Sequence, residues 1–540
     1  MKNTRFIVIL LAVVLPLFFF GLGKMALTDP DETFYAQTAQ EMLDAGEWST
    51  PIIFGEPQFE KPILYYWLVI GSYKVFGVNE FAARFPSAVL GVIGVAGVYL
   101  LGRFFFSARA GLFSALILAT CAEYVVLSRA CVTDMALMVF VLFCMLFFLG
   151  GWIKGKRYLY FFSAAMAALA VLTKGPIGLF IPVVTIGLYV LLSRQWKKIK
   201  DVPFGWCALI FFAICLPWYI TAARIHGAVF INEFFGFQNI TRFLKPEHRI
   251  GTSPFFYIPV VVGGFFPWSI FLPMAAWHMY KERNAASRVK AHGLFLAAWF
   301  LVVFVFFSVS RTKLVTYIFP LFPVMAVVTG RFWERFTAGA EDSALRKHMK
   351  ISFAAFVAVS ILALAGICLF VGFYKDQRYI QALSGTRVTG AVFAAGLVVS
   401  WMFFIRGRKS FSFYAIILTV VLASFPLILR ILPEIEKIES SRMLSLEVKK
   451  IAAQGEAIGG ESDHCRGVAF YTGRTDIVDI HPFSSLKAFL SREERVWCII
   501  QRKHYEQMVK FMPGKVSEPL FESGKYVVVT NKPGSEETGA

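Results

Sequence analysis

Long apolar runs dominate this sequence and leave few folds open to it. A bilayer core takes about 20 apolar residues per helix, and counting runs of roughly that length predicts about thirteen membrane spans. They lie near residues 6–27, 82–102, 111–128, 134–153, 159–173, 177–193, 204–222, 255–277, 293–309, 314–330, 351–373, 388–405 and 411–431. Hydrophobic residues make up 57% of the chain, whereas soluble domains hold about 45–50% apolar residues. The sequence therefore predicts a polytopic α-helical membrane protein.

The positive charge of the chain is concentrated in short segments between these runs. The formal net charge is +19 at pH 7, but no zinc-finger spacing, RNA-binding aromatic motif or basic tail is found, so nucleic acid is not an expected partner. Basic clusters instead occur at residues 154–157, 194–200, 281–290, 346–350 and 406–409. With thirteen spans they all fall on the side of the N-terminus, which the positive-inside rule makes cytoplasmic. The first run is interpreted as an uncleaved signal anchor, and the C-terminus is predicted to lie outside.

The composition changes from apolar to soluble after about residue 432. Residues 1–432 are predicted to form the membrane domain, and residues 433–540 a small α/β domain outside the cytoplasm. Apolar alternation predicts short strands and intervening helices in the second domain: strands at 467–471, 477–480, 495–500 and 526–530, and helices near 441–453, 485–492 and 504–512. Cys465 and Cys498 lie in this domain and are candidates for a disulfide on the oxidising side of the membrane.

The first outer loop, residues 28–81, carries an unusual concentration of charge for a segment held at a membrane surface. Asp31 and Glu32 open an expected helix, where acids either stabilise the helix N-terminus or serve a site that takes protons or orients a hydroxyl. Glu60 and Lys61 precede an aromatic segment that is expected to lie along the membrane as an interfacial helix. They are either a surface ion pair or a contact for an anionic headgroup.

Further charged residues stand at the outer ends of later spans. Arg129, Asp134 and Lys174 are either locally satisfied or snorkelling groups, or members of an outward-facing cavity. Other outer junctions carry groups that suit a phosphate, Arg through bidentate hydrogen bonds and Lys as a point charge. These residues are Arg242, Arg311, Lys313 and Tyr317. Together the positions predict an outward cavity with acids on one wall and phosphate-binding cations on others.

Six motifs resemble one known family: DPDETFYA, PQFEKPILYYW, SRACVTDMAL, TKGP, NITRFLKPEHR and SRTKLVTYIFPLFP. They are similar to motifs of the bacterial aminoarabinose transferases, lipid A modifying enzymes akin to the protein O-mannosyltransferases. The resemblance implies the GT-C glycosyltransferase fold in the bacterial inner membrane, with the α/β domain in the periplasm. It also implies that the enzyme transfers a sugar, with inversion, from a polyprenyl (undecaprenyl) phosphate donor. The implied acceptor is lipid A, lipopolysaccharide or another glycolipid, and membrane lipids surround the protein.

The resemblance assigns roles to residues of this sequence. It implies that Asp31 is the principal catalytic acid, that Asp134 is the second acid of the site, and that Lys61 lies near the lipid phosphate. The other candidate substrate-binding residues are Glu32, Tyr35, Glu60, Arg129, Lys174, Arg242, Arg311, Lys313 and Tyr317.

Two positions depart from the family pattern. Phe34 stands where relatives usually have an arginine, which removes one phosphate partner. Gln238 stands where relatives often have a histidine that can pair with the glutamate of FEKP to hold a metal. Glu60 is therefore the one candidate ligand for a divalent metal, and no cofactor is expected to be required.

Two other functions share these sequence features. A protein O-glycosyltransferase would use the same kind of donor and differ in its acceptor. A transporter of lipid-linked sugars would share the many spans and the outer cations, but the sequence has no inverted internal repeat, and its charges gather on one face rather than near the bilayer midplane. Transfer to a glycolipid is the preferred interpretation.

Overall fold

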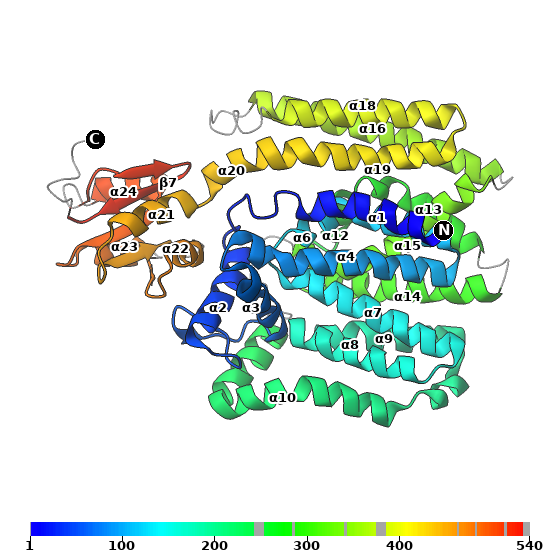
Figure 1. Cartoon of the computed structure of the whole chain (residues 1–540), viewed down its shortest axis with the longest axis horizontal. Coiled ribbons are helices and arrows are strands. Elements are labelled where there is room, and N and C mark those ends of the chain that lie inside the picture. The colour runs from blue at the N-terminus through cyan, green and yellow to red at the C-terminus, as the bar shows by residue number, and fades with distance from the viewer. Residues whose placement is uncertain are drawn as a thin grey trace.

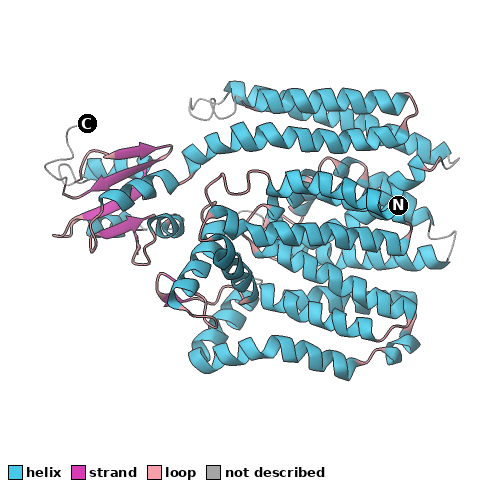
Figure 2. Ribbon diagram, in the orientation of Figure 1, coloured by secondary structure: helices cyan, strands magenta, loops and turns pink. Residues whose placement is uncertain are grey.

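The computed structural model of this chain describes residues 2–241, 253–282, 287–339, 343–373, 385–461, 464–480, 483–511 and 516–532. Long helices run side by side through the larger part of the molecule, and a small α/β domain lies at one end of them (Figure 1). The N-terminus lies toward the opposite end. Most of the strands belong to the small domain (Figure 2).

Within the described residues, eight helical segments are long and apolar enough to cross a membrane. They are α4 (Glu80–Phe105), α7 (Thr133–Lys154), α10 (Phe204–Phe230) continuing into η2 (Ile231–Thr241), α14 (Ser287–Val309), η4 (Val315–Leu321) with α15 (Phe322–Thr337), α16 (Ser343–Phe373), α18 (Thr386–Ile405), and α19 (Lys409–Pro426) continuing through η5 (Leu427–Ile431) and α20 (Leu432–Glu439). Counting the bent pair α5 (Ala108–Ala119) and α6 (Ala122–Ser128), which meet at 70°, as one span gives nine. Shorter apolar helices are α1 (Lys2–Phe19), α8 (Tyr158–Lys174) and α9 (Ile177–Ser193).

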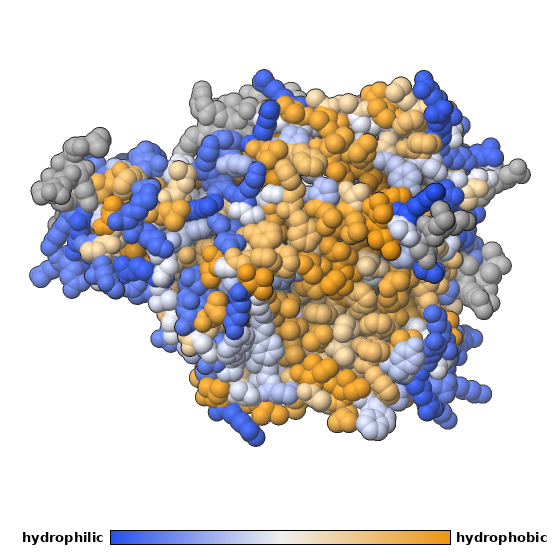
Figure 3. Space-filling view, in the orientation of Figure 1, coloured by the Kyte–Doolittle hydropathy of each residue, from blue (hydrophilic) through white to orange (hydrophobic). Residues whose placement is uncertain are grey.

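The predicted fold class, a polytopic helical membrane protein with a C-terminal α/β domain, is confirmed. Two predicted spans are divided. The run over 111–128 is bent between α5 and α6, and the run over 255–277 is divided into α12 (Tyr257–Gly264), η3 (Trp268–Ile270) and α13 (Leu272–Glu282). Gly263 and Gly264 end α12, and Pro267 has no N–H group with which to continue the helix. Figure 3 shows the apolar middle of the molecule between hydrophilic ends, as expected for helices that face lipid.

The first outer loop forms a compact layer at one end of the membrane helices. It contains α2 (Asp31–Ala45), the hairpin of β1 (Ile52–Ile53) and β2 (Glu56–Pro57), and α3 (Leu64–Phe76). Tyr65 and Tyr66 of α3 are fully buried, because α3 packs against α2, α4 and α8. The expected interfacial helix is therefore a packed helix that ends at Phe76. Asn79 then caps α4 by accepting a hydrogen bond from the backbone N of Ala82 at 2.9 Å.

The C-terminal domain is built on a five-stranded mixed sheet in the order β4-β3-β5-β7-β6. Its elements are α21 (Arg442–Ile451), β3 (Ala457–Gly460), α22 (Cys465–Thr472), β4 (Val478–Asp479), α23 (Phe483–Leu490), β5 (Val496–Gln501), α24 (Arg502–Phe511), β6 (Phe521–Ser523) and β7 (Tyr526–Thr530). β3 pairs in parallel with β4 and β5, and β7 pairs antiparallel with β5 and β6. Apolar side chains of α21 and α22 cover one face of the sheet, and those of α23 and α24 cover the other.

One prediction for this domain is wrong, and the candidate disulfide is not formed. Residues 467–471 are helical, in α22, and do not form a strand. This helix is buried between α2 and the rest of its own domain, and a short run that is apolar on both sides has no period by which strand and helix can be told apart. Cys465 and Cys498 are both free, because they belong to apolar clusters on opposite faces of the sheet.

Candidate active site

A cavity of about 260 Å³ lies where the first outer loop meets the ends of the membrane helices. Its charged lining residues are Glu60, Lys61, Asp134 and Lys174, and its other polar lining residues are Gln238, Ser310, Thr312 and Tyr317. The apolar wall includes Phe180 of α9 and Phe306 and Phe307 of α14. One part of the cavity therefore suits a charged group, and the other suits a hydrocarbon chain.

Asp134 and Lys174 form an ion pair on the polar side of the cavity. Asp134 lies in the first turn of α7, and Lys174 is the last residue of α8, so a helix terminus holds each of them. The distance from Lys174 Nζ to Asp134 Oδ1 is 2.7 Å. The same ammonium stands 5.3 Å from the centroid of the Tyr317 ring, within the range of a cation–π contact. These contacts join α7, α8 and η4 at the cavity wall.

Glu60 and Lys61 reach the cavity from the loop before α3. Gln58 shapes this loop: its Oε1 accepts a hydrogen bond from the backbone N of Glu60, and its Nε2 donates to the Tyr66 hydroxyl, both at 2.9 Å. The Lys61 ammonium donates to the Glu60 carbonyl oxygen at 3.2 Å. A cation of the C-terminal domain, Arg466, has its Nη2 3.8 Å from Glu60 Oε1. Glu60 thus lies between cations from two domains.

Asp31 lies beside the cavity, at the first residue of α2, and not among the lining residues. Its side chain is exposed, but neighbouring protein removes part of its hydration. This desolvation and the negative charges of Asp134 and Glu32 raise the pKa of Asp31. The positive charges of Arg466 and Lys61 partly oppose the rise. An accessible carboxylate with a raised pKa is suited to accept a proton.

Glu32 is bound within the protein, and its predicted contact with substrate stays a prediction. Its carboxylate pairs with the Arg84 guanidinium through Nε at 2.8 Å and Nη2 at 2.7 Å, and both side chains are 6% exposed. It also accepts hydrogen bonds from the backbone N of Cys131 at 2.7 Å and of Thr28 at 3.0 Å. Burial acts to raise the pKa of Glu32, but Arg84 and these hydrogen bonds outweigh it and lower the pKa. Glu32 therefore fastens the first outer loop to α4 and to the segment before α7.

Tyr35 and Arg129 also serve packing and do not line the cavity. The Tyr35 hydroxyl lies 3.4 Å from Thr133 Oγ1, and burial raises its pKa well above the ordinary value. Arg129 Nη1 donates to the carbonyl oxygen of Leu17 at 3.0 Å and so connects the segment before α7 with α1. Both residues therefore help to hold the site together, and their predicted contact with substrate stays a prediction.

The cations predicted at the later outer junction are not brought into the cavity. Ser310 and Tyr317 of this junction line it. Lys313 instead donates to the carbonyl oxygen of Ser310 and is 6% exposed, while Arg311 is exposed and does not line the cavity. The predicted contact of Lys313 and Arg311 with substrate stays a prediction. Arg242 lies outside the described residues.

The donor set around Glu60 does not fit a metal ion. No group of three or more His, Cys, Asp or Glu side chains in the described ranges is placed to hold one. Glu60 is flanked by the cations Lys61 and Arg466, and Gln238 offers the cavity a neutral amide. Among the described residues, the Glu60 carboxylate therefore faces the guanidinium of Arg466 and not further metal-ligating side chains.

Three polar residues of the site were not predicted. Ser310 and Thr312 line the cavity and flank Arg311 in the motif SRTK. The motif was recognised, but only its two cations were predicted to bind phosphate. Arg466 belongs to the α/β domain, where the sequence around it carries no recognisable functional pattern. Only the packing of that domain on the first outer loop reveals it.

Residues 60–220 match the family model described as dolichyl-phosphate-mannose-protein mannosyltransferase. A Pseudomonas aeruginosa protein named undecaprenyl phosphate-alpha-4-amino-4-deoxy-L-arabinose arabinosyl transferase is 31% identical over 406 residues, which are 74% of this chain and 72% of that relative. A relative of the same name from Enterobacter sp. is 30% identical over 370 residues, which are 67% of this chain and 65% of the relative.

Among solved structures, ArnT from Cupriavidus metallidurans bound to undecaprenyl phosphate has the same fold over almost the whole chain. The TM-score is 0.84 at 22% sequence identity, and the match covers 99% of both chains. The apo state of the same protein gives a TM-score of 0.82 and covers 100% of both chains. The likeness includes the membrane helices and the C-terminal domain together, and it confirms the expected GT-C architecture.

Proposed function

Because this chain belongs to the family of undecaprenyl phosphate-alpha-4-amino-4-deoxy-L-arabinose arabinosyl transferases, we propose that it moves a sugar from a polyprenyl phosphate donor to a glycolipid of the lipid A class. The chain is a multi-pass membrane glycosyltransferase. We further assign residues 1–432 to the catalytic membrane domain and residues 433–540 to a periplasmic domain. The opposite placement of the N-terminus and the C-terminal domain supports this orientation (Figure 1), as do the basic connections.

The mixed character of the cavity carries this proposal. A polyprenyl phosphate has one anionic group and a long hydrocarbon chain, and the cavity offers Lys61 and Lys174 beside an aromatic wall that includes Phe180 and Phe306. The phosphate fits the charged part, where the ammonium groups act as point charges. The hydrocarbon chain fits the aromatic part.

The proposed reaction is a single displacement at the anomeric carbon of the sugar. An acceptor oxygen forms the new bond to this carbon, the bond to the phosphate oxygen breaks, and its electron pair leaves on the phosphate. Lys61 and Lys174 stabilise the developing charge, a form of electrostatic help that often dominates catalysis. Asp31 accepts the proton if the acceptor is a hydroxyl, and it positions the oxygen if the acceptor is already an anionic phosphate.

Mass spectrometry of outer-membrane lipid from cells with and without this protein tests the acceptor and the sugar together. Loss of a pentose or hexose mass from lipid A in the deficient cells is the expected result. Unchanged lipids together with loss of a sugar from secreted proteins would move the assignment to protein O-glycosylation, the acceptor class in the name of the family model that matches residues 60–220.

Replacing Lys61 with alanine should raise the KM for the polyprenyl-linked donor about tenfold to 100-fold. A hydrogen bond to a charged partner contributes about 1.5–3 kcal/mol, and each 1.4 kcal/mol is about a factor of ten. Initial rates at varied donor concentration in proteoliposomes would measure the change. Lys74→Ala is the matched control, because Lys74 is an exposed lysine of α3 that stacks on Trp48 outside the cavity. An unchanged KM for Lys61→Ala would remove Lys61 from the phosphate site.

A further inference from the structure

The C-terminal domain reaches the active-site region through Arg466, which lies on α22. Its guanidinium carbon stands 4.6 Å from the centroid of the Phe34 ring, and its Nη2 lies 3.8 Å from Glu60 Oε1. In the described part of the chain Glu60 is its one ion-pair partner, and the two groups are too far apart for a hydrogen bond. The side chain is 29% exposed. Arg466 therefore has donors available beside the cavity.

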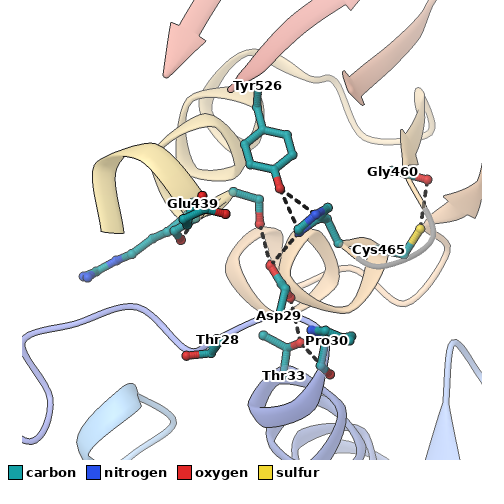
Figure 4. Close-up of polar contacts among 12 residues, drawn as sticks. Thr28, Asp29, Pro30, Thr33, Glu439, Gly460, Cys465 and Tyr526 are labelled. Carbon is teal, nitrogen blue, oxygen red and sulfur yellow. Dashed lines mark hydrogen bonds and ion pairs between the residues drawn. The ribbon is translucent and has the colours of Figure 1, made fainter. Parts of the chain in front are cut away.

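The position of Arg466 is fixed because α22 is tightly attached to the first outer loop. Asp29 lies at the start of this loop, and its carboxylate accepts a hydrogen bond from Thr33 Oγ1 of the same loop at 2.7 Å. From the C-terminal side it accepts a hydrogen bond from Ser441 Oγ at 3.3 Å and lies 3.3 Å from His464 Nδ1 (Figure 4). A Cβ atom at Gly467 would lie 2.5 Å from Asp29 Oδ2, so the helix meets the loop without a gap.

A second buried contact supports the same attachment. The hydroxyl of Tyr471, one turn further along α22, accepts a hydrogen bond from the backbone N of Leu27 at 2.7 Å. Its ring also lies under the guanidinium of Arg442, 5.8 Å from the centroid. Contacts before and after Arg466 in the sequence hold α22 in place. The Phe34 ring then packs against one face of the guanidinium, and the N–H groups at the rim of the guanidinium can bind a ligand.

The chemistry of the guanidinium and its place in the fold indicate which ligand it takes. Arginine binds phosphate through two parallel hydrogen bonds, which gives a defined orientation. The donor phosphate is assigned to Lys61 and Lys174 inside the cavity, and Arg466 does not line that cavity. Arg466 belongs to the domain at the end of the membrane helices (Figure 1). A group that contacts it must therefore project from the membrane surface, as the headgroup of a large glycolipid does.

We propose that Arg466 is a substrate-binding residue which the C-terminal domain contributes to the acceptor site, and that it holds a phosphate group of the acceptor headgroup. This inference rests on the proposed transfer to a glycolipid. It makes the C-terminal domain part of the site, because Arg466 of α22 would contact the acceptor on the same side as Glu60 and Asp31.

Binding of lipid A to the full chain in detergent tests this assignment without requiring turnover. Bisphosphorylated lipid A, dephosphorylated lipid A and undecaprenyl phosphate would be titrated against the wild type, Arg466→Gln and Arg466→Lys. Arg466→Gln should weaken binding of bisphosphorylated lipid A about tenfold, since one charge-assisted contact is lost. Its binding of the other two lipids should not change, and Arg466→Lys should recover part of the loss. Arg474→Gln, in the same domain and paired with Asp476, is the control expected to bind like the wild type.

Three results would overturn the assignment. They are unchanged lipid A binding by Arg466→Gln, an equal loss of undecaprenyl phosphate binding, and a wild type that does not distinguish the two forms of lipid A. The proposed function has a separate readout, which is sugar transfer by the wild type. A wild type that binds lipid A through Arg466 but transfers no sugar to it would refute the proposed function and the acceptor role of Arg466, while the contact of Arg466 with the lipid A phosphate would remain established.

Discussion

Replacement of Asp31 by asparagine should lower kcat for sugar transfer about 100-fold or more, with little change in the KM for the donor. Asparagine keeps the size of the side chain but cannot accept a proton, and a positioned proton acceptor contributes about 10²–10⁴-fold to a rate. Asp31 is exposed beside the cavity, so it can reach an acceptor, and it is not among the residues that line the donor cavity. Transfer in vesicles loaded with a polyprenyl-linked sugar would measure the effect.

The pH profile gives the same prediction a second readout. The pKa of Asp31 is raised by desolvation and by Asp134. The active form is the carboxylate, which is lost as the pH falls through this raised pKa, so kcat/KM should decline on the acid side at a pH above the ordinary aspartate value of about 4. This decline should be absent in Asp31→Asn.

A matched control separates this effect from a change in the helix. Asp44 is an exposed acid in the last turn of the same helix, and Asp44→Asn should behave like the wild type. Activity of Asp31→Asn close to that of the wild type, with an unchanged acid limb, would exclude Asp31 from the mechanism.

The membrane architecture could be predicted because hydrophobicity is a local property of the chain. A run such as 134–153 is long enough to span a bilayer whatever it packs against, and α7 occupies that position. The site could be predicted in part for a similar reason. Asp134 and Lys174 stand at span ends on one side of the membrane, and helices that cross the same bilayer bring such ends to one level, where the two side chains meet at 2.7 Å.

The direction in which each side chain points could not be predicted in the same way. Asp31 and Glu32 are adjacent in one motif, yet Asp31 is exposed and Glu32 is bound to Arg84. A helix turns about 100° per residue, so neighbours face different surroundings, and only the tertiary structure decides which one is buried. The position of Arg466 was harder still to predict from the sequence, because its place beside Glu60 depends on how the C-terminal domain packs on the first outer loop.

Replacement of Arg84 by methionine should lower the free energy of unfolding by about 3–5 kcal/mol, the usual result of breaking a buried ion pair by removing one partner. Glu32 would lose both guanidinium hydrogen bonds while it remained buried. The carbonyl oxygens of Met25 and Ala26 would also lose their donors, which lie at 2.8 and 2.7 Å. Denaturant unfolding in detergent would measure the change, and Arg103→Met, at an exposed arginine near the other end of α4, should have little effect.

The pH dependence of stability should change sign between the wild type and Arg84→Met. In the wild type the folded pKa of Glu32 is lowered, so its contribution is fully present above the ordinary glutamate pKa of about 4.3 and is lost as the pH falls through the folded value. Without Arg84, burial raises the pKa of Glu32, so the unpaired carboxylate destabilises the folded state and its protonation relieves this destabilisation. Acid should therefore weaken the wild type and partly rescue the variant, and Arg84→Met with Glu32→Gln should be more stable at neutral pH than Arg84→Met alone. A variant as stable as the wild type at neutral pH would show that Glu32 and Arg84 do not fasten the first outer loop to the membrane helices, and the placement of Asp31 would then need another cause.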